Sequence, residues 1–108
     1  MTDTPRYALY ESKYTCYIAN RMNEECTMMA TIAGRCCESG DLIQRDVMAP
    51  ESTCRGDIAA VCTTGAYNYS MSSNYNRIAR PPVVMLKNKS SYIAVQRETF
   101  EDLCRNDV

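Results

Sequence analysis

The sequence contains no histidine, and this absence removes several common kinds of active site. Nucleophile systems of the Ser-His or Cys-His type cannot be built within this chain, because both rely on an imidazole base. Any group of the chain that transfers a proton near neutral pH must therefore be a cysteine, a carboxylate, a lysine or a tyrosine, unless a bound cofactor does so.

Long apolar runs and a large charge of one sign are also absent. No stretch approaches the roughly 20 apolar residues that span a bilayer. The 12 basic and 13 acidic residues are interspersed and leave a net charge of -1. No basic stripe favours nucleic acid, and no basic cluster favours an anionic membrane surface. We therefore expect no nucleic-acid partner and no membrane partner.

Cysteine is abundant, with seven residues, but its spacing forms no recognisable framework. The count is odd, Cys36 and Cys37 are adjacent, and no Cys-x-x-Cys pair occurs. Disulfide frameworks use even counts, and zinc sites use close ligand pairs. We predict no metal, reduced thiols in a cytoplasmic protein, and burial of most cysteines as small hydrophobic residues. A cysteine-based metal or redox protein is the alternative.

Hydrophobic patterning predicts short strands separated by polar loops. The expected strands cover residues 13–19, 27–33, 42–43, 58–63, 83–86 and 92–95, with the last two forming a hairpin and an exposed connection at 49–55. Because regular β-α-β alternation is absent, the pattern predicts a mainly β, antiparallel fold with two or three short helices.

Three segments are expected to be helical. Residues 6–11 form the first. Tyr67, Met71 and Tyr75 recur at every fourth residue and predict one continuous helix that begins at Ala66. The third helix follows Thr99, which forms an approximate capping box with Asp102.

Four segments carry more specific information than composition does. They read Arg-Tyr-Ala-Leu-Tyr at 6–10, Cys-Glu-Ser-Gly-Asp at 37–41, Gly-Ala-Tyr at 65–67 followed by Met-Ser-Ser-Asn-Tyr-Asn at 71–76, and Arg-Glu-Thr-Phe-Glu-Asp-Leu at 97–103. In this order and at these separations they resemble the C-terminal end of the diaminopimelate decarboxylase family. That family belongs to the alanine-racemase-like class of pyridoxal-phosphate enzymes, and the resemblance covers nearly the whole chain.

The resemblance implies a fold and a division of the chain. Family members combine a (β/α)8 barrel, which holds the cofactor, with a C-terminal β domain of sandwich-like or barrel-like shape. Residues 1–12 are then a remnant of the last barrel crossover, and residues 13–108 form the C-terminal β domain. The lysine that binds the cofactor lies in the family's barrel. We therefore expect a fragment of a longer enzyme, inactive alone and poorly soluble because apolar surface and strand edges are exposed.

The resemblance also implies a reaction and a partner. The complete enzyme would use pyridoxal 5′-phosphate to convert meso-2,6-diaminopimelate to L-lysine and CO2 as a homodimer. Cys37 would be the catalytic proton donor, reaching across the dimer interface to the partner's cofactor. Glu38 would bind the distal ammonium group of the substrate. Without the resemblance, a buried cysteine and a solvated glutamate are the ordinary interpretations.

Three further residues receive roles from the same resemblance. Arg6 would bind the distal carboxylate of the substrate through its planar guanidinium. Tyr10, four residues later on the same helical face, would add a hydrogen bond to the substrate. Tyr67 would donate a hydrogen bond to the cofactor phosphate, although periodicity alone favours a core tyrosine. The chain departs from the family pattern at Tyr7 and Tyr14, where proline and histidine are common.

Two alternatives concern function. Family relatives that act on ornithine or arginine tend to carry aspartate after the cysteine, whereas this chain has Glu38. A β domain of such an enzyme is one alternative. The other is a non-catalytic dimerisation module that keeps the subunit interface.

Overall fold

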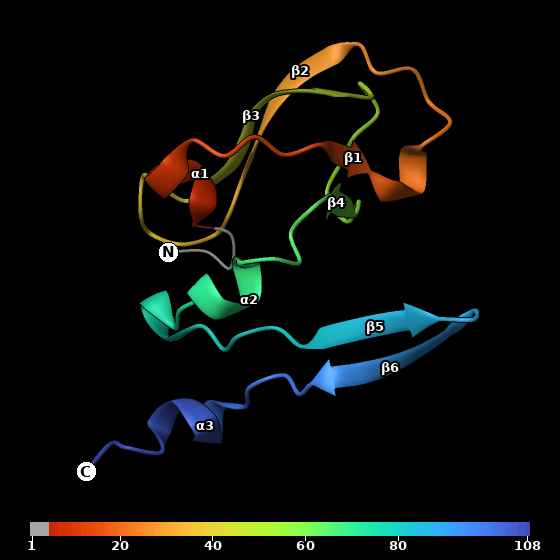
Figure 1. Ribbon diagram of the computed structural model, residues 1–108. Helices are drawn as coiled ribbons and strands as arrows, with labels where there is room; N and C mark the ends of the chain where they lie inside the picture. Colours follow the sequence, from red (N-terminus) through yellow and green to blue (C-terminus); the bar gives the residue numbers. More distant parts are fainter. Residues whose placement is uncertain (1–4) are drawn as a thin grey trace.

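The computed structural model describes residues 5–108, and Figure 1 shows how their elements are arranged. The first four residues of the predicted barrel remnant, residues 1–12, lie outside this range. Every strand pair in the described part is antiparallel, and the helices are short. The predicted mainly β, antiparallel fold is therefore confirmed.

Six strands form three separate two-stranded ladders within residues 5–108. The pairs are β1 (Cys16–Ile18) with β4 (Ala59–Val61), β2 (Met28–Ala33) with β3 (Leu42–Ala49), and β5 (Val83–Lys87) with β6 (Ser90–Val95). β5 and β6 form the predicted hairpin. Its turn residues Asn88 and Lys89 have φ angles of 51° and 62°, the type I′ geometry that matches the twist of paired strands.

The helical elements are α1 (Arg6–Tyr10), η1 (Ala19–Arg21), α2 (Asn68–Met71), η2 (Tyr75–Arg77) and α3 (Phe100–Cys104). The predicted capping box at α3 is confirmed. The Asp102 amide donates to Thr99 Oγ1, and the Thr99 amide donates to the Asp102 carboxylate. These bonds satisfy two amides that a helix N-terminus otherwise leaves without partners.

The prediction of one long helix from Ala66 is wrong. α2 ends at Met71, and Ser72 is extended. The hydroxyls of Ser70 and Ser72 donate to the carbonyls of Tyr67 and Tyr69. Serine side chains compete with backbone amides in this way and favour helix ends. The chain then turns at η2, where Asn76 has a left-handed backbone with φ 57°.

The core is small, and it lies where β1 meets β3. Its buried apolar residues are Cys16, Val47 and Ala49. The exposed connection expected at 49–55 is wrong at its start, because Ala49 and Pro50 are both buried. Within residues 5–108 no cysteine forms a disulfide, and only Cys16 is buried. The prediction that most cysteines are buried is wrong because so small a core accommodates few side chains.

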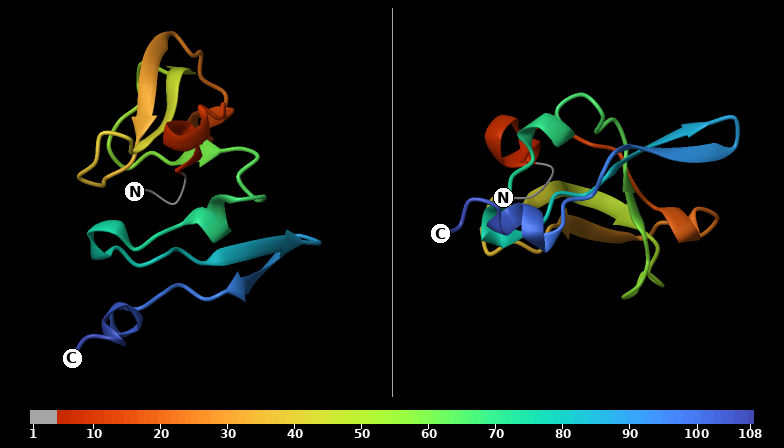
Figure 2. Two further views of the ribbon diagram at one scale, coloured as in Figure 1. Left: turned by 60° about the vertical axis from the view of Figure 1, so that its left-hand side comes forward. Right: turned by 90° about the horizontal axis from the view of Figure 1, so that it is seen from below.

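The chain has an open shape. Its radius of gyration is 15.5 Å and its extents are 51 × 39 × 26 Å, whereas a compact chain of this length has a radius of about 13 Å. Figures 1 and 2 show the β5–β6 hairpin extending away from the other ladders. No helix within residues 5–108 is long and apolar enough to cross a membrane.

Candidate functional site

The helix α1 presents Arg6 and Tyr10 on one face because the two residues are four positions apart. The helix ends at Glu11, whose amide donates to the Tyr7 carbonyl and whose left-handed backbone lets the Ser12 amide donate to the Arg6 carbonyl. The short segment is thereby closed, and the Arg6 side chain is directed toward α2.

Arg6 brings three predicted site residues together. Its guanidinium carbon lies 4.4 Å from the ring centre of Tyr67 and 5.6 Å from that of Tyr10. Both distances are in the range of cation–π contacts. We call Arg6, Tyr10 and Tyr67 the cationic cluster. It joins α1 to the first turn of α2, where Tyr67 is the N-cap residue.

The cationic cluster has unused hydrogen-bonding capacity. The Arg6 Nε is buried and has no hydrogen-bond partner among the described residues. Tyr67 is 54% exposed, so it is not the core tyrosine that periodicity favours. A guanidinium with a free donor beside an exposed phenol is suited to an anion such as a carboxylate or a phosphate.

The loop between β2 and β3, residues 34–41, carries the other two predicted site residues. Asp41 anchors this loop: it is only 4% exposed and accepts a 2.7 Å hydrogen bond from the Cys36 amide. The Gly34 amide donates to the Asp41 carbonyl at 2.9 Å. Both bonds tie the start of the loop to its end, so the residues between them are displayed outward.

Cys37 is exposed at the tip of this loop. Its amide donates to Asn76 Oδ1 at 2.9 Å, and its carbonyl accepts from the Tyr75 hydroxyl at 3.2 Å. It borders an open hollow of about 840 Å³ that extends to Phe100. The ordinary interpretation of Cys37 as a buried residue is therefore wrong, and its side chain lies on a surface that another molecule can reach.

Glu38 is exposed, but its carboxylate has a definite position. Glu38 Oε1 accepts a 2.8 Å hydrogen bond from the Gly40 amide. A Cβ atom at Gly40 would lie 2.9 Å from both Glu38 carboxylate oxygens and 3.2 Å from the Cβ of Ala8. Glu38 and Tyr7 of α1 border the same open hollow of about 660 Å³.

The five predicted residues thus form two groups rather than one. The cationic cluster lies beside Arg6 on α1, whereas the Glu38 end of the loop contacts α1 at Ala8. Successive residues of a helix are about 100° apart, so Ala8 lies on the flank opposite Arg6. Within one chain the cationic cluster and Glu38 therefore lie on different sides of α1, whereas Cys37 is held beside η2.

Sequence reasoning missed the role of Tyr75 and Asn76. The sequence indicated no role at the site for either residue, yet they make the hydrogen bonds that hold the backbone of Cys37. The motif at 71–76 marked their position. The contact itself depends on the left-handed backbone of Asn76, which a sequence pattern does not reveal. No cluster of potential metal ligands occurs within residues 5–108.

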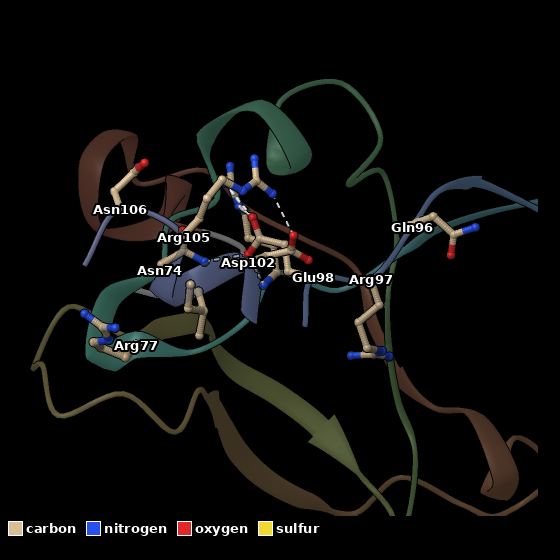
Figure 3. Close-up of a pocket in the computed structure, with 10 residues that line it drawn as sticks. Asn74, Arg77, Gln96, Arg97, Glu98, Asp102, Arg105 and Asn106 are labelled. Carbon is tan, nitrogen blue, oxygen red and sulfur yellow. Dashed lines mark hydrogen bonds and ion pairs between the residues drawn. The ribbon is translucent and has the colours of Figure 1, made fainter. Parts of the chain in front are cut away.

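A network behind η2 fixes this turn (Figure 3). The Glu98 carboxylate accepts hydrogen bonds from Asn74 Nδ2 at 2.6 Å and from the Arg80 amide at 2.8 Å. It also pairs with the Arg80 guanidinium at 2.7 Å. The bond from the Arg80 amide, followed by that from Asn74, lowers the pKa of Glu98 below its ordinary value. Glu98 is therefore held ionised beside the turn.

Comparison with known proteins places the chain in a family. The family model described as "Pyridoxal-dependent decarboxylase, C-terminal sheet domain" matches residues 1–65. Diaminopimelate decarboxylase of Halalkalibacterium halodurans is 49% identical over all 108 residues, and that of Bacillus subtilis is 48% identical over the same length. The chain covers 24% of each of these relatives, so it spans about a quarter of their length.

Solved structures agree with these sequence matches. The crystal structure of diaminopimelate decarboxylase from M. jannaschii superimposes with a TM-score of 0.86 at 35% identity, covering 98% of this chain and 24% of that one. The chain belongs to the pyridoxal-dependent decarboxylase family, in which it corresponds to the C-terminal sheet domain.

Proposed function

We propose that this chain is the C-terminal part of a diaminopimelate decarboxylase, which converts meso-2,6-diaminopimelate to L-lysine and CO2. The observation that carries the proposal is the presence of two groups: the cationic cluster beside α1, and the exposed Cys37 and Glu38 on the loop between β2 and β3. The relatives' names support the substrate class, as does a solved M. jannaschii relative described as a complex with L-lysine.

The cationic cluster fits two anions, the cofactor phosphate and the distal carboxylate of the substrate. The Tyr67 hydroxyl is exposed and donates to the phosphate. Arg6 has a buried Nε without a partner in the described chain, and it binds the substrate carboxylate with Tyr10 beside it. When bound, pyridoxal phosphate supplies the electron sink for the pair of electrons that the departing carboxylate leaves behind.

Cys37 and Glu38 act on the other parts of the substrate. Loss of CO2 breaks a carbon–carbon bond, and a new carbon–hydrogen bond replaces it. Cys37 Sγ donates the proton to the substrate carbon and regains one from solvent. Glu38, positioned by the Gly40 amide, pairs with the distal ammonium group of the substrate. Arg6 and Glu38 together select a substrate whose far end is zwitterionic.

The separate placement of the two groups supports a homodimer. One substrate needs both groups, but the cationic cluster and Glu38 lie on different sides of α1 in a single chain. Each active site is therefore completed by Cys37 and Glu38 of a second subunit. Residues up to 12, including α1, belong with the barrel in this assembly, and residues 13–108 form the β domain. Because cysteines without disulfides are typical of a reducing compartment, we place the enzyme in the cytoplasm.

A hybrid enzyme tests the proposal. In it, this chain replaces the matching segment of the Bacillus subtilis relative, to which it is 48% identical. We expect turnover of meso-diaminopimelate at least about 100-fold above that of ornithine or arginine, since a site built for a charged group rejects substrates that lack it. Preferred turnover of ornithine would contradict the proposal. A folded, cofactor-loaded dimer without any turnover would contradict it too.

A further inference from the structure

The loop that carries Cys37 is held by two residues from a distant part of the sequence. Asn76 Oδ1 accepts from the Cys37 amide at 2.9 Å, and the Tyr75 hydroxyl donates to the Cys37 carbonyl at 3.2 Å. These bonds use both polar groups of the Cys37 backbone. They leave its side chain free to project from the loop.

The holding residues are themselves fixed. Just before them, Asn74 donates 2.6 Å and 3.1 Å hydrogen bonds to the Glu98 carboxylate and the Ile78 carbonyl. Just after them, Arg77 forms a 2.6 Å ion pair with Asp107. Figure 3 shows Asn74 and Glu98 directed toward each other behind the turn. η2 therefore has contacts of its own at both ends, in addition to those with the loop that it holds.

The backbone of Asn76 explains why this residue type stands here. Its φ of 57° lies in the left-handed region, which asparagine adopts more readily than most residues. In that conformation its side chain meets the amide of Cys37. The same position therefore needs both a left-handed backbone and a short side chain with an acceptor oxygen.

We propose that Tyr75 and Asn76 are positioning residues for the Cys37 thiol. They fix the two backbone groups on either side of its Cα and thereby set where Sγ lies. This inference rests on the proposed function for its catalytic consequence. The Cys37 thiol then lies within reach of the substrate carbon before the proton is transferred. Such placement affects kcat, because small displacements of a reacting group raise the activation barrier.

Three substitutions separate positioning from mere folding. Asn76→Gly keeps the left-handed backbone without cost but removes the acceptor. Asn76→Asp keeps both and serves as the rescue. Tyr75→Phe removes only the hydroxyl. The matched controls are Asn88→Gly, which makes the same change at a φ of 51° in the β5–β6 turn, and Tyr92→Phe on exposed β6.

In the hybrid enzyme we expect Asn76→Gly to lower kcat about tenfold and Tyr75→Phe several-fold, with KM unchanged. Asn76→Asp restores most of the rate, and the two controls keep it. In a Cys37→Ser background, Asn76→Gly should have no further effect, because no thiol remains to be positioned. An equal fall in both backgrounds, or no fall in the Cys37 enzyme, would overturn the inference.

Amide hydrogen exchange provides a readout apart from activity. In the hybrid enzyme and in the full 108-residue chain, Asn76→Gly should speed exchange at the Cys37 amide several-fold, whereas Asn88→Gly should leave it unchanged. Unchanged exchange in Asn76→Gly would overturn the inference directly. If the hybrid is folded and inactive while the Cys37 amide shows this Asn76-dependent protection, the holding contact stands and the proposed function is the part that fails.

Discussion

Gly40 controls the place of the Glu38 carboxylate. A Cβ atom at position 40 would lie 2.9 Å from both carboxylate oxygens. Since Gly40 does not have a positive φ, the backbone accepts alanine and the mobile carboxylate moves instead. We predict that Gly40→Ala in the hybrid enzyme raises KM for meso-diaminopimelate about tenfold with a smaller effect on kcat, because Glu38 contacts only the distal ammonium group.

The control for that substitution is Gly65→Ala. A Cβ atom at Gly65 would meet nothing within 4 Å, and its φ is not positive. Steady-state kinetics of both variants should show the KM change at position 40 only. Equal KM values for Gly40→Ala and the parent hybrid would mean that the Glu38 carboxylate does not bind the substrate from this position.

Asp57 gives the chain a predictable response to acid. Its carboxylate is 8% exposed and forms a 2.6 Å ion pair with Arg21 Nε. The hydrogen bond from Arg21, followed by those from the Cys54 amide and Asn20, lowers the pKa of Asp57 well below its usual range. A lowered pKa in the folded state contributes stability above the unfolded pKa of about 3.9, and this stability is lost as the pH falls toward the lower folded value.

We therefore expect the urea midpoint of the 108-residue chain to fall between pH 4 and pH 2, and Asp57→Asn to weaken this dependence. At pH 7 the same substitution should lower the midpoint. Asp46→Asn is the matched control, because Asp46 is exposed and asparagine tolerates its left-handed backbone. An unchanged pH dependence in Asp57→Asn would show that other carboxylates dominate acid unfolding.

At the level of elements, the β5–β6 turn is built with one unfavourable residue. Lys89 has a φ of 62°, where a side chain is strained and glycine is not. Lys89→Gly creates the Asn-Gly pair that favours type I′ turns. We predict a gain of roughly 0.5–1 kcal/mol in the free energy of unfolding, measured by urea unfolding of the chain.

Lys87→Gly provides the contrast for the turn prediction. Lys87 is the last residue of β5 and pairs with Ser90, so glycine there adds only flexibility and should lower stability. If both glycines destabilise the chain, the left-handed geometry at position 89 is not a source of strain.

Elements differ in how far the sequence predicted them. The capping box at Thr99 and the β5–β6 hairpin depend on local residues and were predicted correctly. β3 was expected at only Leu42 and Ile43 but extends to Ala49. Its middle is polar and lies at a register shift, and the residues on both sides of the shift are held as a strand by pairing with β2. Such pairing depends on distant residues, as do the contacts of Tyr75 and Asn76 with Cys37.

At the level of the whole molecule, the two groups of site residues make a test of subunit exchange possible. Arg6 and Cys37 belong to different groups within one chain, and the proposed function assigns them to different active sites of a dimer. We predict that mixing and refolding two inactive hybrid enzymes, Arg6→Ala and Cys37→Ala, restores about a quarter of the parent activity. Half of the dimers are then mixed, and each mixed dimer has one intact site.

The control for subunit exchange is a mixture of Arg6→Ala with Tyr67→Ala. Both residues belong to the cationic cluster of one subunit, so a mixed dimer has no intact site and should stay inactive. No recovery in the first mixture would show that Arg6 and Cys37 reach the same site from one subunit. Recovery in the control would show that Arg6 and Tyr67 reach one site from different subunits, against their grouping in the cationic cluster.

The apolar surface of the open chain bears on its solubility. Leu86 on β5 is 81% exposed and Phe100 on α3 is 77% exposed. Surfaces of this kind are covered in a soluble assembly or promote association. We predict that the isolated chain binds a hydrophobic dye and precipitates at concentrations where the hybrid enzyme stays clear. Equal dye binding by the two proteins would contradict this.

The turn η2 forms hydrogen bonds with the main-chain amide and carbonyl of residue 37, and every amino acid except proline has both groups. These hydrogen bonds therefore do not depend on which side chain stands at position 37. An aspartate or a selenocysteine would be presented at the same place and in the same direction as the cysteine. The acidic residue at position 37 can therefore be exchanged for one of different acid strength without a change in the fold. The side chain at position 37 determines the chemistry, and the hydrogen bonds from η2 determine where that side chain lies.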